Sequence, residues 1–300
     1  MMKVYKKIIQ LCFLTGILFL LLTYPALTLR YAKEGLSIWY QSMVPALLPM
    51  MILTSCMIKL NVTSMFASIL HPITKRLYHL SKNGSYALLV GFLCGFPMGA
   101  KVICELYTQN KLSKEEANAL LPICNNIGPI FLLTFGLKAF VTNRLLLVLL
   151  LFYAIPLVYA FFLFQKKQFQ AGIKHSVARK SFSVALDEAI SEGAAGILSL
   201  GGYLMFFSIL TLIPRELLHL SSKLSAFFTC FMEITSGLYI AAELPPYVLL
   251  AFLQFGGICC IFQTIKYISN TDLSFKNYIV HKLILTVITL VFFFVYYAFA

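Results

Sequence analysis

Charged side chains are scarce in this chain: Asp, Glu, Lys and Arg make up 12% of its 300 residues, and tryptophan occurs once. A soluble domain is about half apolar and about a quarter charged. This chain is 60% hydrophobic and its mean hydropathy is +0.86, which excludes a soluble globular protein. No apolar run alternates with a period of two residues, which disfavours a membrane β-barrel. The sequence predicts an all-α integral membrane protein.

Acidic residues are also few, 11 against 24 basic ones, so the net charge is +13. The basic residues concentrate in short loops between apolar segments, above all in 60–84 and 166–184. Loops rich in Lys and Arg stay on the cytoplasmic side of a membrane, so we expect both loops to be cytoplasmic. No polar domain presents the basic residues as a surface, and we therefore expect the lipid bilayer, not nucleic acid, as a partner.

Motifs for catalysis and metal binding are missing. The chain contains no H-E-x-x-H, no G-x-S-x-G and no Walker loop. Its eight cysteines include no C-x-x-C pair, and its histidines lie mainly in loops without the spacing of metal ligands. We expect no enzymatic activity and no resident cofactor or metal, while a coupling ion, Na⁺ or a proton, stays open.

Nine apolar segments approach the ~20 residues that a helix needs to cross the hydrocarbon core. They are 8–29, 37–59, 85–104, 119–141, 145–165, 185–213, 224–244, 247–268 and 280–299. The first lies behind Lys3, Lys6 and Lys7, is too long for the core of a signal peptide and is followed by no A-x-A site. It predicts an uncleaved first span with a cytoplasmic N-terminus.

Three apolar segments lie between the two basic loops, and three crossings would place those loops on opposite sides. One segment should therefore enter the membrane and return. The candidate is 85–104, where "GFLCGFPMGAKV" combines glycines with a proline that interrupts a helix. The second half poses the same problem, since the loop 269–282, with Lys276 and Lys282, also looks cytoplasmic. Here the candidate re-entrant segment is 224–244.

Both halves then follow one plan of span, re-entrant segment, span and span. We expect an extra transmembrane helix in 1–36, a first repeat in 37–165, a basic cytoplasmic linker in 166–184 and a second repeat in 185–300. This gives about seven spans and two re-entrant segments. The second repeat begins on the opposite side from the first, so the sequence predicts an inverted-topology repeat of the kind found in secondary transporters.

Helices that break inside the membrane leave backbone groups free to hold a solute. The candidate substrate-binding residues lie at such breaks: Gly95, Pro97, Gly99 and Lys101; Asn125 and Asn126; Glu233, Ser236 and Gly237; and Gly256, Gly257 and Gln263. Lys101 could neutralise an anionic solute or extend to the membrane surface. Glu233 could carry a proton, bind Na⁺ or bond a solute hydroxyl. Structural roles stay open for all four clusters: helix packing through glycines, an amide bond between helices, or an ion pair.

The segment "GFLCGFPMGAKVICELYTQNKLSKEEANALLPICNNIGPIFLLTFG", 91–136, resembles the signature block of the sporulation integral membrane proteins, a nucleoside-recognition (Gate) domain family. "FMEITSGL" and "FGGICCIFQ" resemble its second-half block. The segments around Pro45–Pro49 and Gly201–Gly202 resemble its two Gate segments. The resemblance implies a relative of the concentrative nucleoside transporters that moves a small anionic solute, dipicolinate, across the membrane enclosing a developing spore.

Residues and resemblance together predict a secondary transporter of a small anionic solute in the cell membrane, in the sporulating case the mother-cell membrane around the forespore. A membrane scaffold or assembly factor for sporulation that transports nothing is the alternative from another class. A nucleoside or ion transporter is the second alternative. A homo-oligomer is also open.

Overall fold

The computed structural model describes residues 2–133, 145–165, 167, 169 and 180–299. Within these ranges the regular structure is helical, without strands, as the composition predicts. Five helical stretches are long and apolar enough to cross a membrane: Pro25–Lys59, Leu145–Phe164, Phe182–Leu217, Pro246–Ile268 and Phe275–Phe299. The protein is therefore an all-α, multi-pass integral membrane protein. The count of about seven spans and the inverted repeat stay predictions.

The N-terminal part is one short and one long helical stretch. Helix α1 is Met2–Thr23, and α2 (Pro25–Ile38) continues through the π-helical turn η1 (Trp39–Met43) into α3 (Val44–Lys59). The predicted single span 8–29 is wrong, because Pro25 begins a new helix, where its missing N–H costs nothing. The predicted boundary after residue 36 falls inside the second stretch.

The predicted loop 60–84 is also partly helical. It contains α4 (Thr63–Phe66), the 3₁₀ turn η2 (Ala67–Ile69) and α5 (His71–Tyr78). Two helices follow, α6 (Lys82–Cys94) and α7 (Met98–Thr108), and they pack against each other. The helix break predicted within 85–104 is confirmed at Gly95–Pro97.

Helix α8 (Lys114–Cys124) ends where the sequence places "NNIGP", and the short α9 (Pro129–Phe131) begins beyond it. Helix α10 is Leu145–Phe164. The remainder of the predicted span 119–141 lies outside the described residues from 134 onward, as does most of the linker 166–184.

The turn between α7 and α8 contains only one half of a capping box. Asn110 adopts a positive φ of 56° there, and the Ser113 hydroxyl accepts a hydrogen bond from Glu116 N at 3.2 Å. In a capping box the Glu side chain would return to the first residue. Instead, the Glu116 carboxylate accepts a bond from Ser81 N at 2.7 Å. Glu116 therefore joins the start of α8 to the start of α6.

The second half repeats the pattern of long and broken helices. Its elements are α11 (Phe182–Leu210), the π-helical turn η5 (Ile213–Leu217), α12 (Ser222–Met232), α13 (Ile234–Leu238), the 3₁₀ turn η6 (Ala241–Glu243), α14 (Pro246–Phe255), α15 (Gly257–Ile268) and α16 (Phe275–Phe299). The predicted loop 269–282 is wrong, because α16 begins at Phe275 and Lys282 lies two turns inside it.

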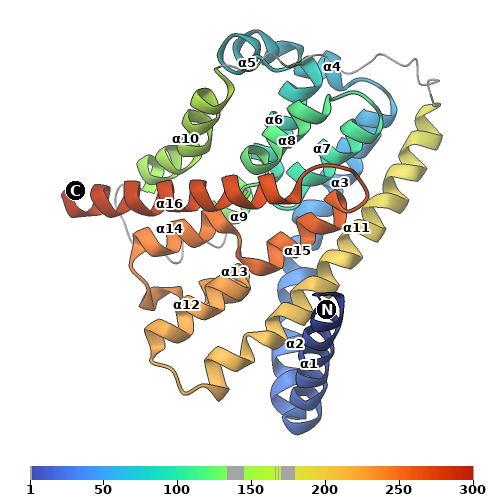
Figure 1. The fold of residues 1–300 in the computed structure, drawn as a ribbon. Helices are drawn as coiled ribbons and strands as arrows, with labels where there is room; N and C mark the ends of the chain where they lie inside the picture. The colour runs from blue at the N-terminus through green and yellow to red at the C-terminus, as the bar shows by residue number, and fades with distance from the viewer. Residues whose placement is uncertain (1, 134–144, 166, 168, 170–179, 300) are drawn as a thin grey trace.

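Two helix pairs frame the molecule. Helices α2 and α3 pack along α11, and α16 crosses the middle of the molecule beside α14 (Figure 1). The single tryptophan, Trp39, joins η1 to α11, because its Nε1 donates to Ile197 O at 2.8 Å. The ring lies so close to Gly201 that a Cβ there would come within 2.7 Å of it. Only glycine leaves room for this contact.

Candidate functional site

Four helices break in the interior, and their ends carry most of the residues that the sequence singles out. The breaks follow Cys94 in α6, Cys124 in α8, Met232 in α12 and Phe255 in α14. At each break the last carbonyls of one helix and the first N–H groups of the next lose their intrahelical partners. These groups need other partners, and the surrounding side chains supply several of them.

The break between α6 and α7 depends on close backbone contact. Gly95 has a φ of +75°, and a Cβ there would overlap the backbone of Gly128 in the neighbouring break. Gly91 and Gly99 face Cys124 in the same way. Gly91 and Gly99 therefore allow close helix packing, which is one of the roles left open by the sequence. The Phe96–Pro97 peptide is cis.

Asn125 and Asn126 are fully buried and use their amides within the protein. Asn125 Nδ2 donates to Thr264 Oγ1 at 2.7 Å and to the Tyr278 hydroxyl at 3.0 Å. Asn126 Nδ2 donates to Ile123 O at 2.5 Å, at the carbonyl end of α8. Two amides in hydrocarbon would cost several kcal/mol without such partners. These bonds join α8 to α15 and α16.

Lys282 stands at the centre of this arrangement with 0% of its surface exposed. Its Nζ donates to Asn125 O at 2.6 Å and to Asn126 Oδ1 at 3.0 Å. Gln254 Nε2 donates to the same Asn126 oxygen at 2.8 Å. The amine also lies 4.6 Å from the centre of the Phe96 ring, a cation–π distance.

The Lys282 amine thus caps the negative carbonyl end of α8, and within the described residues no carboxylate pairs with it. A buried cation is costly unless it is paired with a counter-charge and hydrogen-bonded. Here the partners are neutral dipoles and an aromatic face. An anion beside this amine would stabilise its protonated form.

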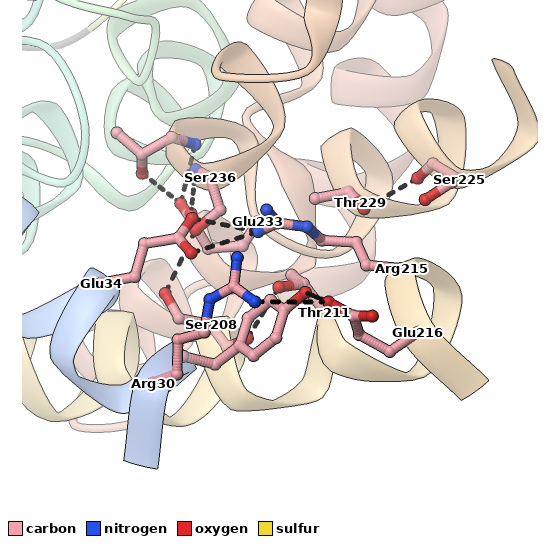
Figure 2. A network of polar contacts seen from close by, with 12 residues as sticks. Arg30, Glu34, Ser208, Thr211, Arg215, Glu216, Ser225, Thr229, Glu233 and Ser236 are labelled. Carbon is pink, nitrogen blue, oxygen red and sulfur yellow. Dashed lines mark hydrogen bonds and ion pairs between the residues drawn. The ribbon is translucent and has the colours of Figure 1, made fainter. Parts of the chain in front are cut away.

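The Glu233 carboxylate is hydrogen-bonded to residues that follow it directly in the sequence. Its carboxylate accepts bonds from the backbone N–H groups of Thr235 at 2.9 Å and Ser236 at 2.5 Å, and from the Thr235 hydroxyl. It is thus the N-cap of α13 and occupies the positive helix end that was expected to attract a solute. Ser236 in turn shares a hydrogen bond with Ser208 at 3.2 Å, beside Glu233 in Figure 2.

A cavity of about 90 Å³ lies between these breaks. Most of its walls are apolar, and its polar groups come from Ser42, Glu233, Thr235 and Gln263. Phe96 lines the cavity and also contacts Lys282, so one ring touches both the empty space and the buried amine. Gly256 makes room for this ring: it has a φ of +86°, and a Cβ there would lie 2.7 Å from Phe96 Cζ.

A second polar group, the α3–α7–α11 cluster, joins the end of α3 to α7 and the first half of α11. It consists of Ser55, Lys59, Lys101, Glu105, Glu188 and Glu192. Lys59 pairs with Glu192 at 2.7 Å and with Glu188 at 3.1 Å. Lys101 belongs to this cluster and does not line the cavity among the described residues.

A third polar group ties α2 to the π-helical turn η5 (Figure 2). Arg215 bonds both oxygens of Glu34, at 3.0 and 3.3 Å, and its guanidinium lies 4.7 Å over the Tyr31 ring. The Tyr31 hydroxyl donates to Glu216 at 2.9 Å. This group and the α3–α7–α11 cluster lie toward opposite ends of α11, with the cavity between them in sequence order.

The chain is similar to a curated protein over most of its length. It is 24% identical over 318 aligned positions to the sporulation integral membrane protein YlbJ of Bacillus subtilis, covering 90% of this chain and 78% of that protein. The similarity extends over nine tenths of this chain. No family model matches it, and no solved structure matches it. The resemblance carried by 91–136 thus has support along the chain.

The structure gathers some of the sequence-selected residues and separates others. Asn125 and Asn126 bond directly with the Lys282 group, while Glu233 and Gln263 line the cavity. Gln263 Nε2 donates to Cys259 Sγ at 3.2 Å. The remaining residues form the breaks themselves, except Lys101: they are Gly95, Pro97, Gly99, Ser236, Gly237, Gly256 and Gly257.

Sequence reasoning missed Lys282, Tyr278 and Thr264, which complete the polar centre. Lys282 was assigned to a basic loop because Lys276 and Lys266 lie near it in sequence. The helical spacing of the residues around Lys282 would have indicated that it lies inside a helix. Tyr278, Lys282, Leu285, Thr289 and Phe293 are spaced four, three, four and four residues apart, and all of them are buried on one face of α16.

Proposed function

We propose that this protein is a secondary transporter of a small organic anion. The observation that supports this most directly is the buried amine of Lys282, which pairs with no carboxylate among the described residues and contacts Phe96 in the cavity wall. A solute carboxylate is the missing counter-charge for such an amine. The apolar walls would hold the hydrocarbon part of the solute, and Ser42 and Gln263 would bond its polar edge.

Phe96 is the side chain that we expect to move during binding. It separates the cavity from the Lys282 amine while contacting both. A rotation of this ring would expose the amine to the cavity and exchange a cation–π contact for an ion pair. A side chain at position 256 would clash with the ring in its present position, because a Cβ there would lie 2.7 Å from Phe96 Cζ.

The membrane topology belongs to the same proposal. Helices α6, α7 and α12 contain 13, 11 and 11 residues. At 1.5 Å per residue none of them spans a hydrocarbon core of about 30 Å. The paired α6 and α7 fit a re-entrant hairpin, and α12 with α13 fits a second. In this proposal α3 and α11, the helices of the Gate-like segments, are equivalent members of two inverted repeats.

Contacts between loops support a shared cytoplasmic side. Lys114 pairs with Asp272 at 2.6 Å, which brings the α15–α16 loop to the start of α8. Glu116 ties that same helix start to Ser81, at the end of the 60–84 segment. Lys180 pairs with Glu188, which lies next to Lys59. The basic segments thus gather through direct contacts, as the positive-inside rule requires of loops on one side.

Dipicolinate is the solute that we propose to test first. It is a planar aromatic ring with two carboxylates, which suits an apolar cavity beside a buried amine, and it is the solute that the family resemblance implies. The proposed place of action is the mother-cell membrane around the forespore. The relative's printed name gives the sporulation connection but no solute.

The decisive experiment is exchange of labelled dipicolinate in proteoliposomes made with the full chain. We expect exchange well above that of protein-free vesicles, inhibition by other small aromatic carboxylates and no inhibition by uridine. Equal flux with and without protein, across several anions, would contradict transport and favour the scaffold role. Inhibition by uridine with no effect of carboxylates would favour a nucleoside transporter instead.

A further inference from the structure

The proposed solute site makes no use of the α3–α7–α11 cluster, although this cluster holds two basic and three acidic side chains in the interior or at its edge. Within it, the Ser55 hydroxyl lies 2.8 Å from Glu192 Oε2 and 3.3 Å from Glu105 Oε1. Ser55 is fully buried. The hydroxyl therefore bridges two carboxyl groups that come from different helices, α7 and α11.

Two hydrogen bonds from this bridge would need a proton on one of the two carboxyl groups. A serine hydroxyl has one hydrogen to donate, and an ionised carboxylate can only accept. Ser55 can therefore donate to one carboxylate only. The second contact is a hydrogen bond only if that carboxyl group is protonated and donates to the serine oxygen.

Glu105 is the better candidate for the proton. Glu192 pairs with Lys59 at 2.7 Å, which stabilises its ionised form, and its bond to Ser55 is the shorter of the two. Glu105 has no ion pair within the described residues and lies half-buried on α7. If Ser55 gives its one hydrogen to Glu192, a protonated Glu105 would donate to the Ser55 oxygen.

The Glu105 side chain has a second possible partner besides Ser55, the amine of Lys101. It lies one helical turn before Glu105, at the spacing where side chains on a helix meet. It is 8% exposed, and its amine has no hydrogen-bond partner among the described residues. Loss of the proton from Glu105 would create a carboxylate that is repelled by Glu192 and attracted by Lys101.

The charges around Glu105 come from every helix packed nearby. They are Lys101 on α7 itself, Lys59 on α3, Glu192 on α11, Lys111 beyond the end of α7 and Tyr86 on α6, with Lys266 on α15 facing Lys101. The Lys111 amine is held by Ile58 O at 2.8 Å. Lys101 is thus the cation best able to receive the ionised carboxylate.

A connected path leads from Glu105 to the surface. Ser55 contacts Glu192, Glu192 pairs with Lys59, Lys59 pairs with Glu188, and Glu188 pairs with the partly exposed Lys180 at 2.6 Å. This end of the molecule holds the basic segments that we assign to the cytoplasm.

We propose that Glu105 binds the coupling proton of the transport cycle, alternating between a protonated state bonded to Ser55 and an ionised state paired with Lys101. A proton from water joins the Glu105 carboxylate and later returns to water, and no other bond changes. The coupling part of this proposal rests on the proposed transport function, whereas the protonated Glu105–Ser55 bridge does not.

The protonation state has a test that needs no transport. Infrared spectra of the purified full chain at neutral pH should contain the C=O band of a protonated carboxyl group, and Glu105→Gln should remove it. The matched control is Glu115→Gln, an exposed acidic residue on α8, which should leave the band unchanged. A wild-type spectrum without a band that depends on Glu105 would overturn the proposal.

Coupling is measured in proteoliposomes with the membrane potential clamped at zero and dipicolinate as the probe. One pH unit across the membrane allows about tenfold accumulation for one coupled proton. We expect gradient-driven accumulation in the wild type and in Glu115→Gln. In Glu105→Gln we expect no accumulation but unchanged exchange, because exchange needs no net proton movement.

The outcomes separate the two proposals. Wild-type exchange without any response to the gradient would overturn the coupling but leave the solute site standing. Accumulation by Glu105→Gln at the wild-type level would overturn the assignment of the proton to Glu105. An infrared band that depends on Glu105 together with no solute exchange would overturn the transport function while supporting the proton site.

Discussion

At the scale of single residues, Lys282 combines a structural role in the fold with the anion-binding role that we propose. It caps α8 through Asn125 O and holds Asn126 Oδ1, while its charge stays uncompensated by any described carboxylate. Substitution therefore affects two things, a helix cap and the charge that we propose binds an anion. Arginine keeps the charge and hydrogen-bond donors, whereas methionine keeps most of the volume but removes both the charge and the donor.

We predict that Lys282→Met weakens dipicolinate binding by about 2 kcal/mol or more, or about 30-fold, as expected when one partner of a buried charge pair is removed. Lys282→Arg should retain part of the affinity. Binding is measured with purified protein in detergent, and Lys276→Met, at an exposed position on the same helix, is the control. Wild-type affinity in Lys282→Met would contradict the anion site.

Glu116 carries a prediction about pH, and it lies outside the five candidate spans. Burial raises the pKa of this carboxyl group from 4.5 to about 7, although the Ser81 N–H and hydroxyl act to lower it. Protonated Glu116 therefore contributes to the free energy of unfolding. This contribution is complete at pH values below the pKa that Glu116 has in the unfolded chain, and it is lost as the pH rises through 7.

We therefore expect the wild type to lose up to about 3 kcal/mol of stability relative to Glu116→Gln between pH 5 and pH 8. Glutamine has the shape of a protonated glutamate and does not titrate. Unfolding in detergent at several pH values measures the difference. The exposed Glu115→Gln should follow the wild type at each pH, and parallel curves for Glu116→Gln and wild type would contradict the assignment.

At the scale of elements, the four helix breaks organise the protein. The break at Gly95 is the clearest case, because the backbone there combines a φ of +75° with direct contact to Gly128. Two breaks thus support each other across the interior. A side chain at this position would strain the backbone and push α6 away from the α8–α9 break.

We predict that Gly95→Ala lowers the stability of the protein by about 1–3 kcal/mol, since both the positive φ and the contact oppose a Cβ. The matched control is Gly202→Ala on α11, where a Cβ would meet nothing within 4 Å. That change should raise stability by about 0.5–1 kcal/mol, because glycine inside a helix is unfavourable. Thermal unfolding in detergent compares the two, and equal effects would contradict the break as described.

The sequence predicts the positions of these breaks better than the contacts they make. Pro97, the Gly128–Pro129 pair and the Gly256–Gly257 pair mark breaks because glycine and proline weaken helices wherever they occur. The partners of Asn125 are different, since Thr264 and Tyr278 lie 139 and 153 residues away. Glu233 was selected as a buried carboxylate, but its use as a helix cap depends on where α13 begins. These contacts depend on tertiary packing and cannot be predicted from the local sequence pattern.

At the scale of the whole molecule, the charge distribution predicts the topology. The basic segments meet through Lys114–Asp272, Ser81–Glu116 and Lys180–Glu188, while η5 and the start of α12 lie at the other end of α11. The parity of the apolar segments predicts a shared side for these loops, and this topology stays a prediction. The loop 269–282 used in that count is wrong, because Lys282 lies inside α16.

We predict that cysteines introduced at Lys75, Lys180 and Asn270 react with a membrane-impermeant reagent only from the cytoplasmic side. A cysteine at His219 should react only from the opposite side. The background protein is Cys12→Ser, because Cys12 is the exposed cysteine among the described ones. Labelling of Lys75 and Lys180 positions from opposite sides would contradict the re-entrant hairpin in the first half.

The bond between Lys282 and Asn125 also fixes an order of events during synthesis. The ribosome releases Asn125 into the membrane about 157 residues before Lys282 appears, so the carbonyl end of α8 waits without its cation while the whole second half inserts. A nascent chain stalled before α16 would hold all four breaks but no central charge. Assembly of the proposed solute site is therefore expected to be one of the last steps of biogenesis.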